Sequence, residues 1–110
     1  SQSHRIKAKK IEYEIVKNES EQDLRAIHFS LETEQKKYQV LQKELKFYKE
    51  IVLPNAELSL EKADILYSAG EIAWFEYLQS FENLTSSKLN YFELLAQLNE
   101  TVLVIDYLTE

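Results

Sequence analysis

The first half of the chain carries a regular stripe of apolar residues on a polar background. Between residues 24 and 52 they follow one another at alternating steps of three and four, with one polar gap at Glu34. Such a 3.5-residue repeat is typical of a coiled-coil helix, because it keeps one side of a supercoiled helix against a partner. Apolar residues between Ile6 and Val16 extend the helix less regularly. The predicted stripe consists of Leu24, Ile27, Leu31, Tyr38, Leu41, Leu45, Tyr48 and Val52.

This arm continues past Val52, but Pro54 interrupts it. Inside a helix, proline removes a backbone hydrogen bond and crowds the preceding turn, at a cost of about 3 kcal/mol. We expect a kink or brief break there; the alternative is that Pro54, which favours first turns, begins a separate short helix. Two apolar rows follow and predict two neighbouring helices: Ala56, Leu60, Ala63 and Tyr67 prolong the stripe, and Ile51, Leu58 and Ile65 form a second row.

Gly70 is the only glycine and predicts the end of the first arm. It follows Tyr67-Ser68-Ala69, and glycine readily takes the left-handed conformation that closes a helix. Helical periodicity resumes directly after it, so the chain is expected to reverse here. The predicted stripe of the returning helix consists of Ile72, Phe75, Leu78, Phe81, Leu84, Leu89, Phe92, Leu95, Leu98, Val102 and Ile105.

Two stretches of the returning arm leave alternatives open. The cluster Thr85-Ser86-Ser87 indicates either a joint between two helices or small residues at a close helix crossing. The stretch from Val102 to Leu108 is apolar and β-branched, so a short strand is the alternative to the helix that we predict there. The fold class predicted is all-α: one long antiparallel helical hairpin that reverses at Gly70.

The two arms of this hairpin are unequal. The long arm covers residues 1–69 and the return arm residues 71–109. At about 1.5 Å per residue the first spans on the order of 100 Å and the second roughly 57 Å. About 30 residues at the amino end therefore lack a partner within the chain, and their apolar stripe is expected to pack on another chain or on a further segment of this one.

Composition narrows the function classes. Hydrophobic residues make up 45% of the chain and charged residues 29%, which argues against a disordered tail. The absence of cysteine excludes disulfides and thiolate zinc sites, and the absence of methionine suggests a piece of a longer protein. Residues 51–110 carry 2 basic against 10 acidic side chains, so a nucleic-acid partner is disfavoured. Only the stretch from His4 to Lys10 looks like a basic patch.

The chain has few side chains in the patterns typical of metal sites or catalytic sites. His4 and His28 are the only histidines, and neither has the spacing that places two metal ligands on one helical face. No glycine-rich phosphate loop or Ser/His/Asp constellation is present. We therefore predict no enzyme activity, no metal site and no cofactor. The aromatics after the turn, Trp74, Phe75 and Tyr77, either staple the turn or dock a partner.

Several short strings resemble the second long hairpin of TolC-type outer-membrane efflux proteins. They are Leu53-Pro54-Asn55-Ala56, Tyr67-Ser68-Ala69-Gly70-Glu71-Ile72, Phe75-Glu76-Tyr77-Leu78, and Asn99 with Tyr107-Leu108-Thr109. The opening, Ser3 to Lys10 followed by Ile11-Glu12-Tyr13, is similar to the stretch that leaves the last β-barrel strand in that family. Within the family the chain looks closest to the heavy-metal (CusC/CzcC-like) branch, including versions fused to the metal-exporting transporter.

The resemblance implies a trimeric channel, in which each protomer contributes two hairpins to a twelve-helix periplasmic tunnel beneath a membrane β-barrel. It implies a periplasmic location and, as partners, a periplasmic adaptor and an RND transporter. The Tyr-x-x-Gly turn would meet the adaptor, and acidic residues past it would narrow the lumen and favour cations. Gln79 stands where a second acid is expected. The implied adaptor contact is Tyr67, Ala69, Gly70, Glu71 and Ile72, and the implied lumen residues are Glu76 and Gln79.

The alternative to a transport conduit is a generic coiled-coil interaction module, such as the hairpin of an adaptor protein. An adaptor normally shows Gly- and Val-rich β segments beside its hairpin, and this chain has none. The conduit interpretation accounts better for the unequal arms and the two apolar rows.

Overall fold

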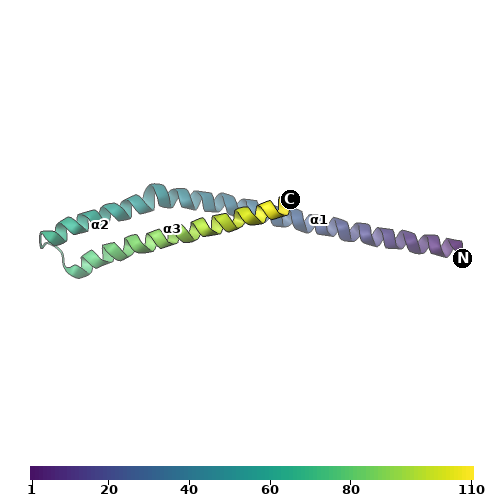
Figure 1. The fold of residues 1–110 in the computed structure, drawn as a ribbon, viewed down its shortest axis with the longest axis horizontal. Coiled ribbons are helices and arrows are strands. Elements are labelled where there is room, and N and C mark those ends of the chain that lie inside the picture. The colour runs from purple at the N-terminus through teal and green to yellow at the C-terminus, as the bar shows by residue number, and fades with distance from the viewer.

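The computed structural model describes all 110 residues as a helical hairpin 99 Å long (Figure 1). Its first arm consists of α1 (Gln2–Phe47), a π-helical turn η1 (Tyr48–Val52) and α2 (Leu53–Ser68). A short connection leads to α3 (Trp74–Thr109), which returns alongside the first arm. The predicted all-α hairpin is confirmed, and Val102 to Leu108 form helix rather than strand.

The apolar stripe predicted for the first arm forms the seam with α3. From Leu31 onward its members are buried or half-buried as far as Ala63, and Glu34 at the polar gap is half-buried as well. Tyr67, at the end of the stripe, remains 41% exposed. The most deeply buried apolar residues of the molecule are Leu41, Ala56 and Ala63, all of them on this seam. The heptad spacing therefore identified the face of the first arm that meets α3.

The stripe predicted for α3 is only partly right. Leu78, Leu84, Leu95, Leu98 and Ile105 are half-buried, but Phe75, Phe81, Leu89 and Phe92 are 49% to 66% exposed. These four side chains therefore lie outside the contact with the first arm. Small and polar residues occupy much of the seam instead, because bulky side chains would hold the two helices apart. The observed seam follows a strict heptad: Tyr77, Ser80, Leu84, Ser87, Tyr91, Leu94, Leu98, Thr101, Ile105 and Leu108.

The Ser/Thr cluster of α3 lies at a close approach of the arms and not at a joint. α3 is continuous through this region, and Ser87 is buried. The Thr85 hydroxyl donates a hydrogen bond to the Phe81 carbonyl at 3.0 Å, so it is satisfied within its own helix. Thr101, the most buried residue of the chain, does the same with the Gln97 carbonyl at 2.8 Å.

Pro54 lies in the first turn of α2, directly after the π-helical turn. The Leu53 N–H donates to the Tyr48 carbonyl five residues earlier, which is the hydrogen bond of a π-turn. Figure 1 shows the first arm bending at this point. The expected kink near Pro54 is therefore present, and the backbone remains helical through it.

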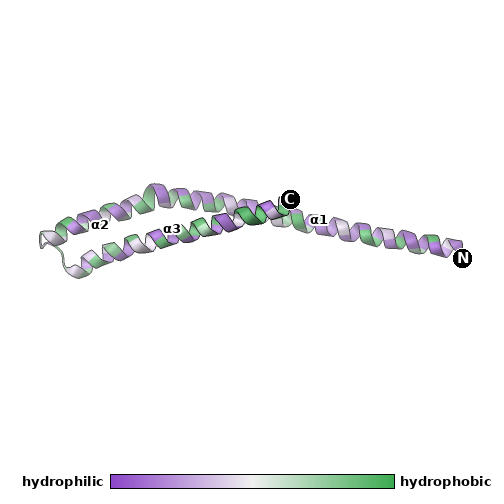
Figure 2. Ribbon diagram, in the orientation of Figure 1, coloured by the Kyte–Doolittle hydropathy of each residue, from purple (hydrophilic) through white to green (hydrophobic).

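The amino-terminal part of α1 extends beyond the end of α3 (Figure 1). All residues from 2 to 30 are exposed, including Leu24 and Ile27, which continue the seam. We call residues 2–30 the overhang. Apolar and polar residues alternate along it as they do along the hairpin (Figure 2). No helix in the structure is both long and apolar enough to cross a lipid bilayer.

Candidate functional site: the hairpin tip

The backbone at the tip forms a tight closure of α2. The Glu71 N–H donates to the Leu66 carbonyl at 2.8 Å, and the Gly70 N–H donates to the Tyr67 carbonyl at 3.0 Å. This pair of bonds is a Schellman motif, which requires a left-handed residue between them. Gly70 supplies it with a φ of 75°, the only positive φ in the chain. The predicted reversal at Gly70 thus follows from glycine's tolerance of this conformation.

An aromatic cluster joins the two arms just behind the turn. The rings of Tyr67, Trp74 and Tyr77 lie 5.4 to 5.6 Å apart, centre to centre, in all three pairs. Such distances are favourable for aromatic pairs, so the cluster staples α2 to the first turns of α3. Trp74 nevertheless remains 56% exposed and Tyr67 41%. The cluster therefore stabilises the turn and also presents aromatic surface at the end of the molecule.

Asp64 adds a polar contact between the arms beside this cluster. A hydrogen bond with the Asp64 carboxylate raises the pKa of the Tyr77 phenol above its usual value of 10.0, and partial burial and the negative charge act in the same direction. Ionised Tyr77 would place two negative charges next to each other. The nearby carboxylate therefore favours the neutral form of the phenol.

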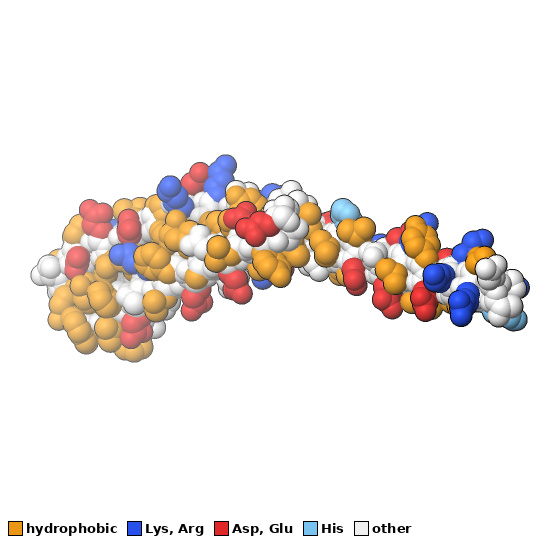
Figure 3. Space-filling model, turned by 45° about the vertical axis from the view of Figure 1, so that its right-hand side comes forward, with side chains coloured by type: hydrophobic (Ala, Val, Ile, Leu, Met, Phe, Trp, Pro, Cys, Tyr) orange, Lys and Arg blue, Asp and Glu red, His pale blue; other side chains and the backbone are white.

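The residues expected to meet a partner lie together around the turn. Tyr67, Ala69, Gly70 and Glu71 are exposed, and Ile72 is half-buried. Figure 3 shows hydrophobic side chains gathered at this end of the hairpin. The tip thus combines a small, flat turn with an aromatic surface immediately beside it.

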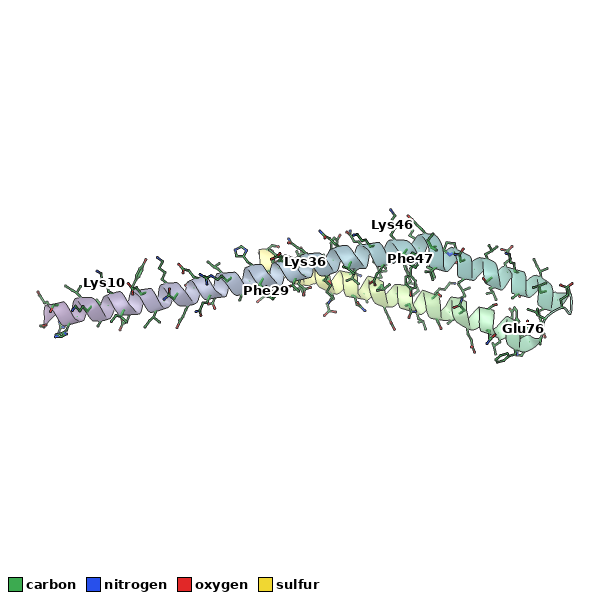
Figure 4. The ribbon with its side chains drawn as sticks, turned by 180° about the vertical axis from the view of Figure 1, so that it is seen from behind. Lys10, Phe29, Lys36, Lys46, Phe47 and Glu76 are labelled. Carbon is green, nitrogen blue, oxygen red and sulfur yellow. The ribbon has the colours of Figure 1, made fainter.

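The two expected lumen residues lie on α3 just past the tip. Glu76 is in the first turn of α3, as Figure 4 shows, and Gln79 follows three residues later. Both are exposed and lie outside the seam. Asp64 was not among the residues that the sequence pointed to, because its partner Tyr77 is thirteen positions away across the turn and no local spacing links them.

The rest of the surface has one hollow and no cluster of metal-ligating side chains. One open hollow of 320 Å³ lies where the end of α3 meets α1, lined by Gln35, Tyr38, Val102, Ile105 and Asp106. Asp106 is its only charged residue, so the hollow lacks the convergent polar groups of an active site. No group of three or more His, Asp or Glu side chains is placed to hold a metal ion.

Comparison with known proteins gives no match: no protein-family model, curated protein or solved structure matches the chain.

Proposed function

We propose that this chain is a periplasmic tunnel segment of an outer-membrane efflux channel, similar to the second hairpin of TolC-type proteins. In this proposal the hairpin forms part of the channel wall and conducts exported substrate, with heavy-metal cations as the candidate cargo. The channel is a trimer that works with an RND transporter, and the hairpin tip docks a periplasmic adaptor. The segment acts by shape and surface and makes or breaks no bonds.

The observation that carries the proposal is the pair of uncovered apolar edges. Each helix in a closed wall packs against two neighbouring helices. Within one hairpin each arm has only one such neighbour, namely the other arm. Ile51, Leu58 and Ile65 on the first arm are 48% to 64% exposed, as the predicted second row requires. On α3, Leu89 and Phe92 are 58% and 61% exposed. Both arms thus have a second contact face, which suits a wall of many helices.

The polar side of α3 supports a path for cations. Glu76, Gln79, Glu93 and Glu100 lie at neighbouring positions of the heptad, away from the seam, and all are exposed. A wall that turns this side to its lumen would present carboxylates to the passing solute. Rings of such charges attract cations and repel anions.

The exposed seam of the overhang favours a second candidate, a coiled-coil interaction module such as an adaptor hairpin. Leu24 is 55% exposed and Ile27 42%, and both would suit any partner helix with a matching heptad. The sequence of the gene around this chain separates the candidates. Alternating strands upstream favour the channel, and lipoyl-like β segments beside the hairpin favour the adaptor.

The docking function is tested at Gly70 with a pair of variants. Gly70→Glu and Gly70→Ala both force a side chain into a left-handed backbone, at about 1–2 kcal/mol. A Cβ atom at this position meets nothing within 4 Å, so the variants share this strain and differ in the charge and size that they add to the tip. The assay is metal or drug resistance in cells whose efflux depends on the gene that encodes this chain.

We expect Gly70→Glu to abolish resistance while Gly70→Ala retains most of it, at equal expression and equal helicity by circular dichroism. Glu82→Gln serves as a control and should keep full resistance, because it changes one exposed charge on α3 outside the tip and the lumen residues. Normal resistance in Gly70→Glu would contradict adaptor docking at the tip. Equal loss in both Gly70 variants would also contradict it, because backbone strain alone would then account for the defect.

A further inference from the structure

The hollow at the end of α3 is the only one on the surface of the molecule. Its volume of 320 Å³ falls within the range of about 300–1,000 Å³ that is typical of small-molecule sites. Its lining combines apolar surface from Tyr38, Val102 and Ile105 with two polar residues, Gln35 and Asp106. A catalytic site needs several converging polar groups, whereas an apolar lining with one charge is enough to bind and orient an amphiphilic molecule.

Asp106 carries the single charge of this lining and has no cationic partner. Its side chain is exposed, and the one salt bridge of the chain joins Lys36 to Glu32 within α1 at 3.4 Å. Figure 4 shows Lys36 on the part of α1 that runs beside the end of α3. An unpaired carboxylate at an apolar hollow is complementary to a ligand that carries a positive charge.

Tyr38 contributes an aromatic ring to the same lining. The Gln42 side-chain amide donates a hydrogen bond to the Tyr38 hydroxyl at 2.8 Å, which restrains the outer end of the ring. A cation within about 6 Å of the centre of such a ring is attracted by its negative face, whereas an anion is repelled. Tyr38 belongs to α1 and Asp106 to α3, so one ligand in the hollow would contact both arms.

We propose that the hollow binds an amphiphilic organic cation, a molecule with an ammonium group on an apolar body of one or two rings. The apolar body packs on Val102 and Ile105, and the ammonium group interacts with the Tyr38 ring and the Asp106 carboxylate. A metal ion does not suit this site, because one carboxylate supplies too few ligand atoms. The ligand contacts both arms, so its binding stabilises the last turns of α3.

The hollow is separate from the cation path of the proposed function. Glu100 and Val102 are two residues apart in α3, which places them about 200° apart around the helix axis. The hollow and the acidic side of α3 therefore face in different directions. The inference goes beyond the proposed function and does not rest on it, because binding is measured on the purified chain without transport.

Binding is tested with three probes that share a naphthyl ring: naphthylmethylammonium as the cation, naphthylmethanol as the neutral analogue and naphthoate as the anion. Methyl NMR signals of Val102 and Ile105 in the full chain report occupancy of the hollow. We expect the cation to bind with a dissociation constant on the order of 1 mM and at least about tenfold more tightly than the neutral analogue. The anion should cause no shift.

Two results of this titration would overturn the proposal. Equal affinity for the cation and the neutral analogue would remove the preference for positive charge. Equal shifts of the Leu89 methyl signals, which belong to an exposed residue elsewhere on α3, would mean that the probe adsorbs to any apolar surface.

A pair of charge variants tests the role of Asp106. Asp106→Asn keeps the size of the side chain and removes its charge, so we expect about tenfold weaker binding of the cation and unchanged binding of the neutral analogue. The matched control Glu44→Gln removes an exposed carboxylate from α1 outside the lining and should bind the cation as the native chain does. Native affinity in Asp106→Asn would overturn the assignment. Equal weakening in both variants would also overturn it, because net charge alone would then explain the effect.

Val102→Phe tests the hollow itself, because the larger side chain fills it. We expect this variant to lose binding of both the cation and the neutral analogue at unchanged helicity by circular dichroism, since Val102 is 37% exposed and can accept a larger ring. In the native chain the cation should slow amide exchange in residues 98–109, and in Val102→Phe it should not. Cation binding that persists in Val102→Phe would place the ligand elsewhere and overturn the proposal.

Discussion

Tyr77 combines three roles at the scale of a single residue. It belongs to the seam, its ring lies 5.5 Å from Tyr67 and 5.4 Å from Trp74, and its hydroxyl interacts with Asp64. The first role follows from heptad spacing, and the second depends on Gly70 turning the chain back at this point. The interaction with Asp64 raises the pKa of the Tyr77 phenol, so we expect the stability of the tip to depend on pH in the alkaline range.

The raised pKa of Tyr77 predicts a loss of stability at alkaline pH. The folded chain holds the phenolic proton above pH 10.0, where the unfolded chain releases it, so the unfolded state binds fewer protons. The stabilisation that the neutral phenol contributes is therefore fully present below pH 10.0. It is lost as the pH rises through the pKa that Tyr77 has in the folded chain. We expect the melting temperature of the native chain to drop more between pH 9 and pH 11 (about the range of tyrosine titration) than that of Tyr77→Phe.

Circular dichroism melts on both proteins measure this difference. Tyr77→Phe keeps the ring but loses the titrating hydroxyl, so the deprotonation of lysines and other tyrosines affects both proteins alike. Asp64→Ala removes both the hydrogen-bond acceptor and the charge, so its stability should depend on pH above 10.0 much as that of Tyr77→Phe does. Identical pH profiles in all three proteins would show that the Asp64 contact does not couple to folding.

At the scale of elements, the sequence predicted the first arm better than the second. In the first arm the apolar residues at steps of three and four are those of the seam, although Phe47 and Ile65 lie outside it. In α3 hydrophobicity and position disagree: Ser80, Ser87 and Thr101 occupy the seam, while Phe92 and Leu103 point outward. A search for apolar residues at steps of three and four selects the more hydrophobic face, which in α3 is the outer one.

At the tip, too, the sequence predicted what a single residue determines and missed what depends on a contact between residues far apart in the chain. Gly70 was predictable because one residue type at one position determines the turn. The contact between Asp64 and Tyr77 was not, because it depends on how two helices align after the turn. The roles of the tip residues in binding a partner remain a prediction.

The π-helical turn corrects a mismatch in the seam of the first arm. From Leu45 to Tyr67 the seam takes six steps over 22 residues, whereas a heptad repeat takes 21. A π-turn contains one more residue than an α-turn and so absorbs the extra one without rotating α2 off the seam. The turn ends just before Pro54, whose missing N–H costs least near a helix start.

Deleting Pro54 should therefore turn the bent arm into a continuous α-helix. The deletion removes both the extra residue and the proline, so every seam step returns to three or four in strict alternation. We expect the free energy of unfolding in urea to rise by about 1–3 kcal/mol. Pro54→Ala retains the extra residue, so it should keep the π-turn and change stability by less than about 1 kcal/mol.

Backbone NMR shifts and amide exchange across residues 48–56 distinguish the two variants. A π-turn that disappears in Pro54→Ala would contradict this account, because proline and not register would then be its cause. A deletion variant that loses stability would mean that α2 needs the bend to meet α3.

At the scale of the whole molecule, the overhang differs from the hairpin in what holds it together. The hairpin helices share a seam and an aromatic cluster, whereas no residue of the overhang is buried. Isolated helices gain little stability from their own hydrogen bonds, because nucleation is unfavourable and tertiary packing normally completes them. The overhang therefore lacks the tertiary packing that normally stabilises a helix. Leu24 and Ile27 lie on the side that a partner would cover.

This difference predicts two levels of amide hydrogen exchange in the monomer. Amides within the hairpin helices, residues 31–68 and 78–109, should exchange at least about a hundredfold more slowly than those of the overhang, because their opening requires loss of the seam. Mass spectrometry of peptic fragments at micromolar protein measures both. Equal exchange rates in the two segments would contradict this account, because the overhang would then be stable without tertiary packing.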